Sequence, residues 1–354
     1  MTATLPPMEF MNPPDLRLEA LRRWISVELA RPMASIDVAS ADASFRRYFR
    51  VTEEGGATLI AMDAPPDKED IRPYLSVARL LAQTGVHVPH VHEVNLAEGF
   101  VLLEDLGSTP YLGELRKPGR AAPLYGAALE ALADIQVNGL ELAAQLPPYD
   151  AAVLEREMGL LTEWFTSRHL GLDLAAEERG LLRASFDLLI AEALAQPKVF
   201  VHRDYHSRNL MVLPERNPGV IDFQDALHGP LAYDLVSLLK DCYIAWPREQ
   251  VERWVHEYRA RLQQRGFPGL PGERELLRQF DMIGLQRHIK VLGIFARLWW
   301  RDGKIGYLAD LPLTLAYCCD TAARYGELQP LARWLEHRIA PNLAAANAKA
   351  RAPS

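Results

Sequence analysis

The sequence has few cysteines and no long apolar run. Its three cysteines, Cys242, Cys318 and Cys319, are too few for a disulfide framework, so we expect core residues in a reducing compartment. No apolar run reaches the ~20 residues of a transmembrane helix. Residues 1–14 lack the basic start and apolar centre of a signal peptide. These absences predict a cytoplasmic protein without membrane association.

An excess of positive charge is also missing. The formal net charge of −7 gives no reason to expect nucleic acid binding. The charge is unevenly spread, because residues 225–354 contain 14 acidic and 18 basic side chains, whereas residues 1–224 contain 32 acidic and 21 basic ones. The last third is therefore mildly basic. A chain of 354 residues is long enough for two domains or one large bilobal unit.

The predicted elements follow the order of a kinase. Apolar residues at helical spacing lie between Asp15 and Arg31, with Asp15 as the cap. Strands are expected from Ile36 onward, including residues 45–51 and 58–62, then a helix over 69–83 and strands at 90–95 and 99–104. This order is typical of a kinase amino-terminal lobe, with the hinge at residues 102–107.

Beyond Gly107 we expect helices, apart from a strand-rich island at residues 199–223. The prediction is an α+β, bilobal, protein-kinase-like fold. Residues 1–106 would form a small β-rich nucleotide-binding lobe with a leading helix. Residues 107–354 would form a larger, mainly helical lobe for catalysis and acceptor binding.

The strand-rich island carries the strongest motif. An apolar strand leads to Asp204, and Asn209 follows five positions later. In the kinase catalytic loop with this spacing, the Asp accepts the proton of the acceptor hydroxyl and the Asn holds magnesium. Thirteen residues after Asn209, a second strand leads to Asp222, a hard oxygen ligand that suits magnesium. We therefore predict ATP and Mg²⁺ as cofactors, Asp204 as the catalytic residue, and Asn209 and Asp222 as metal ligands.

At these residues the chain resembles the aminoglycoside phosphotransferase family, relatives of choline and homoserine kinases. His206, two positions after Asp204, stands where protein kinases usually have lysine, and it favours a small-molecule acceptor. The segment 229–235 also matches, and the resemblance implies that its Asp234 braces the catalytic loop. The similarity extends over residues 34–331.

Four segments, 40–50, 61–66, 202–211 and 286–297, resemble the anomeric amino-sugar kinases of Gram-negative cell-wall recycling. The resemblance implies an amino-sugar substrate, with phosphorylation of the C1 hydroxyl of N-acetylmuramate or N-acetylglucosamine. It also implies a downstream uridylyltransferase that uses the product, without a stable complex between the two enzymes.

Two features of the protein-kinase nucleotide site are missing. The segment 41–47 stands where a Gly-rich loop would cover the phosphates, and it contains no glycine. Ser44 and the amides of Phe45 and Arg46 can still reach phosphate oxygens, and an ordinary polar hairpin is the alternative. The resemblance further implies that the carbonyl of Glu104 and the amide of Leu106 bind adenine.

The third strand also lacks the expected lysine. Arg46 or Arg47 would then supply the positive charge, with Arg50 and Lys68 as alternatives. Without the lysine, an ion-pair role for Glu69 is doubtful, and Glu69 would instead favour the amino end of the following helix.

The acceptor would meet residues close to the catalytic motif. Gln224 and Asp225 follow Asp222 directly and are expected to face the acceptor. His206 and Arg208 lie on the catalytic loop, where both can bond sugar hydroxyls or the N-acetyl group. Alternatively, His206 bonds a backbone carbonyl to brace the loop, and Arg208 pairs with a carboxylate such as that of Asp225.

A basic stripe at helical spacing contains Arg287, Lys290, Arg297 and Arg301. A solvated helix face is the ordinary interpretation. The functional alternative is that Arg287 or Arg297 binds the lactyl carboxylate of N-acetylmuramate, since arginine suits bidentate carboxylate binding. The basic last third favours an anionic or neutral sugar over a polycationic antibiotic.

Three hypotheses follow from the sequence. The first is an amino-sugar kinase, and the second is another small-molecule kinase of the aminoglycoside and choline kinase family. The third is a catalytically silent nucleotide-binding module that acts through partner contacts. Only the missing lysine and glycines support the third, and the intact Asp204, Asn209 and Asp222 argue against it. The preferred sugar, the anomer and the choice between ATP and GTP stay open.

Overall fold

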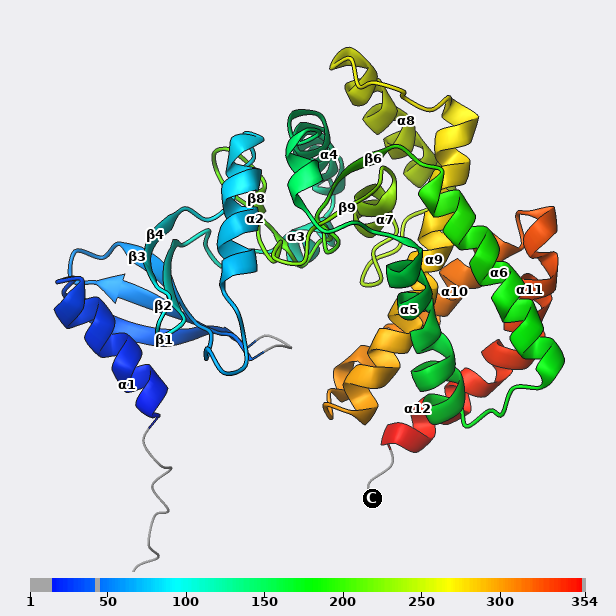
Figure 1. The fold of residues 1–354 in the computed structure, drawn as a ribbon, viewed down its shortest axis with the longest axis horizontal. Helices are drawn as coiled ribbons and strands as arrows, with labels where there is room; N and C mark the ends of the chain where they lie inside the picture. The colour runs from blue at the N-terminus through cyan, green and yellow to red at the C-terminus, as the bar shows by residue number, and fades with distance from the viewer. Residues whose placement is uncertain (1–14, 42–44, 352–354) are drawn as a thin grey trace, which may run out of the picture. The chain divides into compact units, whose positions relative to one another are not determined.

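The computed structural model describes residues 15–41 and 45–351, which form two compact units (Figure 1). The sheet unit contains residues up to Leu75 together with Pro89–Leu106. The helical unit contains Ser76–Val88 and the chain from Gly107 onward. A β-rich region followed by a mainly helical one confirms the predicted α+β fold class.

The sheet unit contains a five-stranded antiparallel sheet in the order β1-β2-β3-β5-β4. The helix α2 (Arg72–Gln83) lies between β3 and β4 in the sequence, so the predicted order of strands and helix is confirmed. The strands are β1 (Met33–Ala41), β2 (Arg47–Glu53), β3 (Thr58–Asp63), β4 (Val91–Asn95) and β5 (Phe100–Glu104).

One helix covers an apolar face of this sheet. Asp15 caps α1 (Leu16–Arg23) as predicted, because its Oδ1 accepts a hydrogen bond from the Leu18 amide over 3.1 Å. The chain continues as the π-helical segment η1 (Trp24–Glu28). Side chains of α1 and η1 pack against apolar residues of β1, β2, β3 and β5, so burial of this amphipathic face stabilises the unit.

The start of α2 differs from the prediction. The helix begins at Arg72 rather than at Glu69, because Asp70 Oδ1 accepts from the Arg72 amide over 3.0 Å and ends the preceding turn. Glu69 lies outside the helix, and its Oε1 accepts from the Phe45 amide over 3.3 Å.

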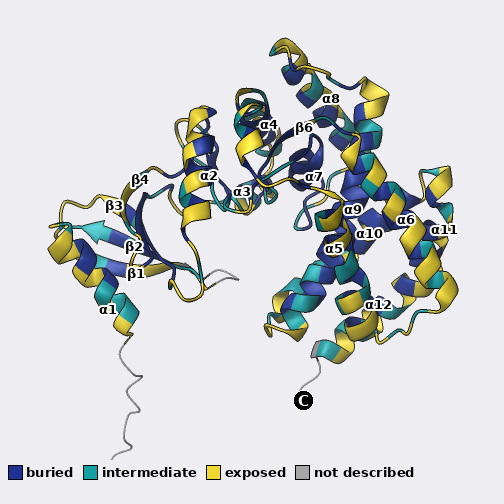
Figure 2. Ribbon diagram, in the orientation of Figure 1, coloured by how far each residue is buried: buried dark blue, intermediate teal, exposed yellow. Residues whose placement is uncertain are grey.

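The helical unit is built around α9 (Glu273–Trp300), which is buried along most of its length (Figure 2). Helices α5 to α8 and α10 all contact it. Because neighbours surround the middle of α9, its charged residues Asp281, Arg287 and Lys290 are removed from water. The other α-helices are α3 (Tyr111–Leu115), α4 (Ala121–Asn138), α5 (Ala151–Leu160), α6 (Ala176–Leu194), α7 (Tyr233–Leu239), α8 (Arg248–Gln264), α10 (Leu311–Ala322), α11 (Gln329–Trp334) and α12 (Ala340–Arg351).

Shorter helical segments connect these helices. Two are π-helical, η3 (Leu161–His169) after α5 and η6 (Leu335–Ile339) after α11. Three are 3₁₀ helices, η2 (Leu142–Gln145), η4 (Ile305–Ala309) and η5 (Gly326–Leu328). Within the described residues, no helix is both long enough and apolar enough to span a membrane.

The predicted strand-rich island is present within the helical unit. Strand β6 (Lys198–Val201) pairs with β9 (Leu227–Pro230), and β7 (Leu210–Met211) pairs with β8 (Gly219–Val220). The two ladders hold the ends of the loop 202–209, which we call the catalytic loop. The three cysteines are free, and two of them are fully buried, as expected for core residues.

Candidate active site

Hydrogen bonds fix the catalytic loop at its first turn. The carboxylate of Asp234, on α7, accepts from the amides of His202 over 2.6 Å and Arg203 over 2.9 Å. The hydroxyl of Tyr205 donates to the carbonyl oxygen of Ala128 on α4 over 2.8 Å. The bracing role that the resemblance implied for Asp234 is therefore confirmed by its geometry.

Two residues of this region adopt left-handed backbone conformations. Arg203 has a φ of 78° and Asp222 a φ of 66°, each of which costs roughly 1–2 kcal/mol for a residue with a side chain. At Arg203 the hydrogen bond from the amide to Asp234 offsets part of this cost. The strain occurs directly before Asp204 and at the predicted metal ligand, as is common at functional sites.

The structure brings Asp204, Asn209 and Asp222 together. The Nδ2 of Asn209 donates to the backbone carbonyl of Asp204 over 3.0 Å and to Oδ2 of Asp222 over 3.1 Å. A backbone hydrogen bond also joins the start of β7 to the end of β8, because the Ile221 amide donates to the Asn209 carbonyl over 3.1 Å. Gln224 Nε2 donates to Oδ1 of Asp222 over 2.9 Å, so its amide nitrogen faces the metal ligand.

The surrounding charges keep Asp204 ionised. Burial by itself would raise the pKa of this carboxyl group, but positive charges, those of Lys290, Arg203 and Arg287 among them, outweigh it and hold the pKa below its ordinary value. An ionised carboxylate accepts a hydrogen bond from an alcohol. Asp204 is therefore chemically suited to orient a hydroxyl group for attack.

Asn209 and Asp222 together fit a magnesium ion. A carboxylate and an amide oxygen are hard ligands, and magnesium usually takes one or two protein carboxylates and completes its shell with water and phosphate. Across residues 15–41 and 45–351, no group of three or more His, Cys, Asp or Glu side chains is arranged to hold a metal. This donor set suits magnesium better than zinc.

His206 and Arg208 share an aromatic neighbour, Tyr243. The His206 ring meets the Tyr243 ring edge-on at 5.5 Å between centroids, and its Nδ1 has no hydrogen-bond partner among the described residues. The Arg208 guanidinium lies over the same ring, 3.5 Å from its centroid, as in a cation–π contact. The structure thus places Arg208 on Tyr243 rather than in the suggested pair with Asp225.

Sequence reasoning missed Asp241, which supports the middle of the loop. Its carboxylate accepts from the Ser207 amide over 3.0 Å and also from the Ser207 hydroxyl. Asp241 lies two residues after the end of α7, the helix that carries Asp234. No local sequence pattern places its carboxylate at Ser207, 34 positions earlier.

The solvated-face interpretation of the basic stripe is wrong for Arg287 and Lys290. Their exposed fractions are 4% and 8%, because α9 is enclosed by other helices. Arg287 Nη1 lies 3.8 Å from the Cys242 sulfur. Arg297 is half-buried and Arg301 is exposed, so only the carboxyl end of the stripe meets water.

Comparison with known proteins agrees with this geometry. The model of the phosphotransferase enzyme family (APH) matches residues 35–276. The chain belongs to this family.

Curated relatives extend the similarity to nearly the whole chain. The N-acetylmuramate/N-acetylglucosamine kinase of Pseudomonas aeruginosa is 46% identical over 331 residues, 91% of this chain and 96% of the relative. The protein of that name in Neisseria meningitidis is 42% identical over 312 residues, 88% of this chain and 92% of the relative.

Solved structures show the same fold. An ethanolamine kinase of Plasmodium vivax has a TM-score of 0.61 at 12% identity, covering 89% of this chain and 97% of its own. An ADP-bound aminoglycoside phosphotransferase has a TM-score of 0.57 at 14% identity, covering 87% and 98%. At these identities the likeness supports the fold alone.

In this phosphotransferase, two arginines considered for phosphate binding are paired with carboxylates. Arg47 contacts both Asp15 and the fully buried Asp63, the latter over 2.5 Å. Arg50 donates to Asp105 over 2.6 and 3.0 Å. These pairs raise the pKa of both guanidinium groups, so their charges are already compensated within the sheet unit.

The other predicted nucleotide residues lie at the two ends of the sheet-unit strands. Phe45 is exposed, and Arg46 is half-buried directly before β2. Ser44 lies outside the described residues. Glu104 ends β5, where its amide donates to the His90 carbonyl over 2.8 Å, and Leu106 is buried.

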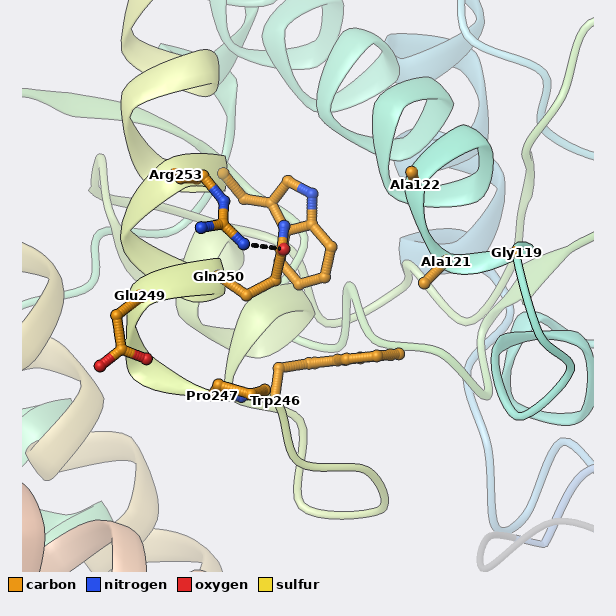
Figure 3. A pocket seen from close by; sticks show the side chains of 9 residues that line it. Gly119, Ala121, Ala122, Trp246, Pro247, Glu249, Gln250 and Arg253 are labelled. Carbon is orange, nitrogen blue, oxygen red and sulfur yellow. Dashed lines mark hydrogen bonds between the residues drawn. The ribbon is translucent and has the colours of Figure 1, made fainter.

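A pocket of about 510 Å³ lies in the helical unit of the phosphotransferase, between the start of α4 and the start of α8 (Figure 3). Its wall combines two indole rings with polar side chains, and Arg253 donates a hydrogen bond to Gln250 there. The lining contains no residue of the catalytic loop, so the pocket adds nothing to the catalytic centre. Its larger side chains are Trp246, Glu249, Gln250, Arg253 and Trp254.

Proposed function

We propose that this phosphotransferase transfers the γ-phosphoryl group of ATP to the C1 hydroxyl of N-acetylmuramate and N-acetylglucosamine. The observation that carries the chemistry is the hydrogen bond between Asn209 and Asp222 beside the Asp204 turn. The observation that supports the substrate is the name shared by relatives that are 46% and 42% identical to this chain.

Each residue of the centre has a separate role in this proposal. Asp204 orients the acceptor hydroxyl and receives its proton as the phosphoryl group is transferred. Asn209 and Asp222 would hold magnesium, which supplies positive charge to the phosphate oxygens when bound. Asp234 and Asp241 fix the loop that carries these groups.

The nucleotide would use mainly backbone groups of the sheet unit. The Glu104 carbonyl and the Leu106 amide bind adenine, and Ser44 with the Arg46 amide approaches the phosphates. The Phe45 amide would join them by exchanging its hydrogen bond to Glu69 for a phosphate oxygen. Arg46 and Arg47 are the candidate phosphate-binding cations, and Arg47 would have to exchange its contacts with two carboxylates for the phosphates.

For the acceptor, we favour Arg208 as the group that binds the lactyl carboxylate of N-acetylmuramate. It is exposed, directly precedes Asn209, and is held in place on the Tyr243 ring. Arg287 is buried against Cys242, and Arg297 is half-buried, so they are second choices. His206, Gln224 and Asp225 would bond the hydroxyl and N-acetyl groups.

The proposal includes a place for the protein in the cell. It would act in the cytoplasm, where intracellular ATP and salvaged amino sugars meet. Its sugar 1-phosphate would be consumed by a uridylyltransferase on the route to a nucleotide-activated sugar.

Phosphorus NMR of the product tests the proposal. The full chain with Mg·ATP should convert N-acetylmuramate or N-acetylglucosamine to the C1 phosphate, and should leave kanamycin and choline unchanged. A C6 phosphate would contradict the anomeric assignment. Turnover of kanamycin or choline alone would favour another small-molecule kinase.

The variant Asp204→Asn tests the catalytic assignment. It should lower kcat by about 10²- to 10⁴-fold, while calorimetry shows unchanged Mg·ATP binding, because Asp204 is not a metal ligand in this proposal. Asp187→Asn, at an exposed carboxylate paired with Arg183, is the matched control and should keep full activity. Full activity of Asp204→Asn would exclude Asp204 as the catalytic residue.

A further inference from the structure

Glu157 is a buried carboxylate on α5 whose two oxygens bind four side chains. Its Oε1 contacts Arg203 Nη2 over 2.5 Å and Lys290 Nζ over 3.0 Å. Its Oε2 accepts from the Tyr149 hydroxyl and from Gln286 Nε2 over 3.2 Å. With an exposed fraction of 5%, this group needs such compensation to stay charged.

The ionised form of Glu157 is strongly favoured. Burial would raise the pKa of this carboxyl group, but the charges of Lys290 and Arg203 and the hydrogen bond from Tyr149 lower it to about 2. Glu157 is therefore an anion wherever the enzyme is folded near neutral pH. Of the four side chains that contact Glu157, only Arg203 lies on the catalytic loop.

Both cations of this cluster also act on Asp204. Arg203 is the residue directly before Asp204 and holds the strained φ of 78°. Lys290, on α9, donates to the Tyr233 hydroxyl over 3.0 Å, and with Arg203 it attracts the Asp204 carboxylate. Among the described residues, Glu157 is the anion in direct contact with both cations, and the charges of both also act on Asp204.

We propose that Glu157 is a positioning residue for phosphoryl transfer: it engages the Arg203 and Lys290 cations so that neither pairs directly with the Asp204 carboxylate. This inference depends on the proposed role of Asp204 toward the acceptor hydroxyl. A direct ion pair would draw the Asp204 carboxylate toward α9 and occupy the oxygen that the hydroxyl needs. Glu157 therefore keeps the Asp204 carboxylate oriented and available to the hydroxyl.

The test begins with Glu157→Gln, which keeps the shape and removes the charge. We expect kcat for the sugar to fall by about 100-fold, the effect of a small misplacement of a catalytic group. The KM values for ATP and for the sugar should change by less than about threefold, because Asp204 acts in the transition state. Glu155→Gln, on the same helix but in an exposed pair with Arg183, should leave kcat unchanged.

A second variant separates positioning from mere support of the fold. Lys290→Met alone should keep kcat within about fivefold of the native value, because Glu157 still engages Arg203. In the double variant Glu157→Gln/Lys290→Met, one free cation remains instead of two, so kcat should rise above that of Glu157→Gln. Replacing Lys290 by Met should therefore lower kcat slightly in the native enzyme and raise kcat in the Glu157→Gln variant.

The outcomes distinguish this inference from the proposed function. A double variant as slow as Glu157→Gln or slower would overturn the inference, as would an unchanged kcat in Glu157→Gln. If Glu157→Gln does not fold, a 100-fold loss in Lys290→Met alone overturns it, because Lys290 would then act on the substrate itself. A native chain that phosphorylates neither sugar would overturn the proposed function instead, and this inference with it.

Discussion

At the scale of single residues, the protonation state of His202, on the catalytic loop, makes the stability of the protein depend on pH. It is fully buried, and the Asp204 amide donates to its Nδ1 over 3.3 Å, which requires that nitrogen to be unprotonated. Burial lowers the pKa of His202 to about 4, against an opposing effect of the Asp204 charge. The folded protein therefore holds a neutral imidazole where the unfolded chain holds one that titrates normally.

This difference predicts acid destabilisation. Below pH 6.5 His202 becomes protonated in the unfolded chain. In the folded protein it becomes protonated only near pH 4. The free energy of unfolding should therefore fall as the pH decreases through this window, by up to about 3 kcal/mol from this group. Urea unfolding at pH 7 and pH 4.5 measures the effect. His202→Gln should weaken the pH dependence, whereas His337→Gln, at an exposed histidine, should preserve it.

The residues found from the sequence are those fixed by local spacing. Asp204, Asn209 and Asp222 lie within 19 consecutive residues, so the motif alone determines that they meet. Glu157 lies 46 positions before Arg203 and 129 before Gln286. Such contacts depend on how α5 packs against α9, which no local pattern specifies.

At the scale of elements, Gly293 allows α9 to approach α5 closely. A Cβ atom at this position would lie 2.4 Å from the carbonyl carbon and 2.5 Å from the Cβ of Leu160. Because one of these atoms is backbone, the helices would have to move apart. Gly293→Ala should lower the free energy of unfolding by about 1–3 kcal/mol.

Another glycine of the same helix provides the control. At Gly284 the nearest atom to an added Cβ is Val236 Cγ1, at 3.4 Å, an ordinary contact. Gly284→Ala should be neutral or stabilise the protein by up to about 1 kcal/mol through helix propensity. Equal urea midpoints for the two variants would show that the closeness of α9 and α5 has no energetic consequence.

Helical periodicity predicted α9 but not its environment. The stripe of Arg287, Lys290, Arg297 and Arg301 has the spacing of a solvated face, yet neighbouring helices cover its first two members. A pattern shows which residues share a face, whereas the number of faces that are covered depends on tertiary packing. The late start of α2 accompanies a local hydrogen bond from the Arg72 amide to the Asp70 side chain, which the spacing of apolar residues does not predict.

At the scale of the whole molecule, the division into two units predicts two levels of stability. In the sheet unit, an apolar cluster packs between α1 with η1 and the sheet, whereas the helical unit has a more extensive cluster that includes α9. A smaller core leaves less stabilisation per ordered residue. Amides of β2, β3 and β5 should therefore exchange hydrogen through openings of lower free energy than amides of α9.

Mg·ATP should narrow the difference in opening free energy between the sheet unit and α9. The reason is that the proposed adenine contacts at Glu104 and Leu106 exist only in the folded sheet unit. At a nucleotide concentration 100 times Kd, the opening free energy of β5 amides should rise by about 2.7 kcal/mol. Chelating magnesium with EDTA, or replacing Asp222 by Asn, should abolish most of that rise if Asp222 holds the metal. Native-state hydrogen exchange followed by mass spectrometry measures all three conditions. Protection that persists without magnesium would show that the nucleotide binds through the sheet unit alone, and Asp222 would lose its assigned role.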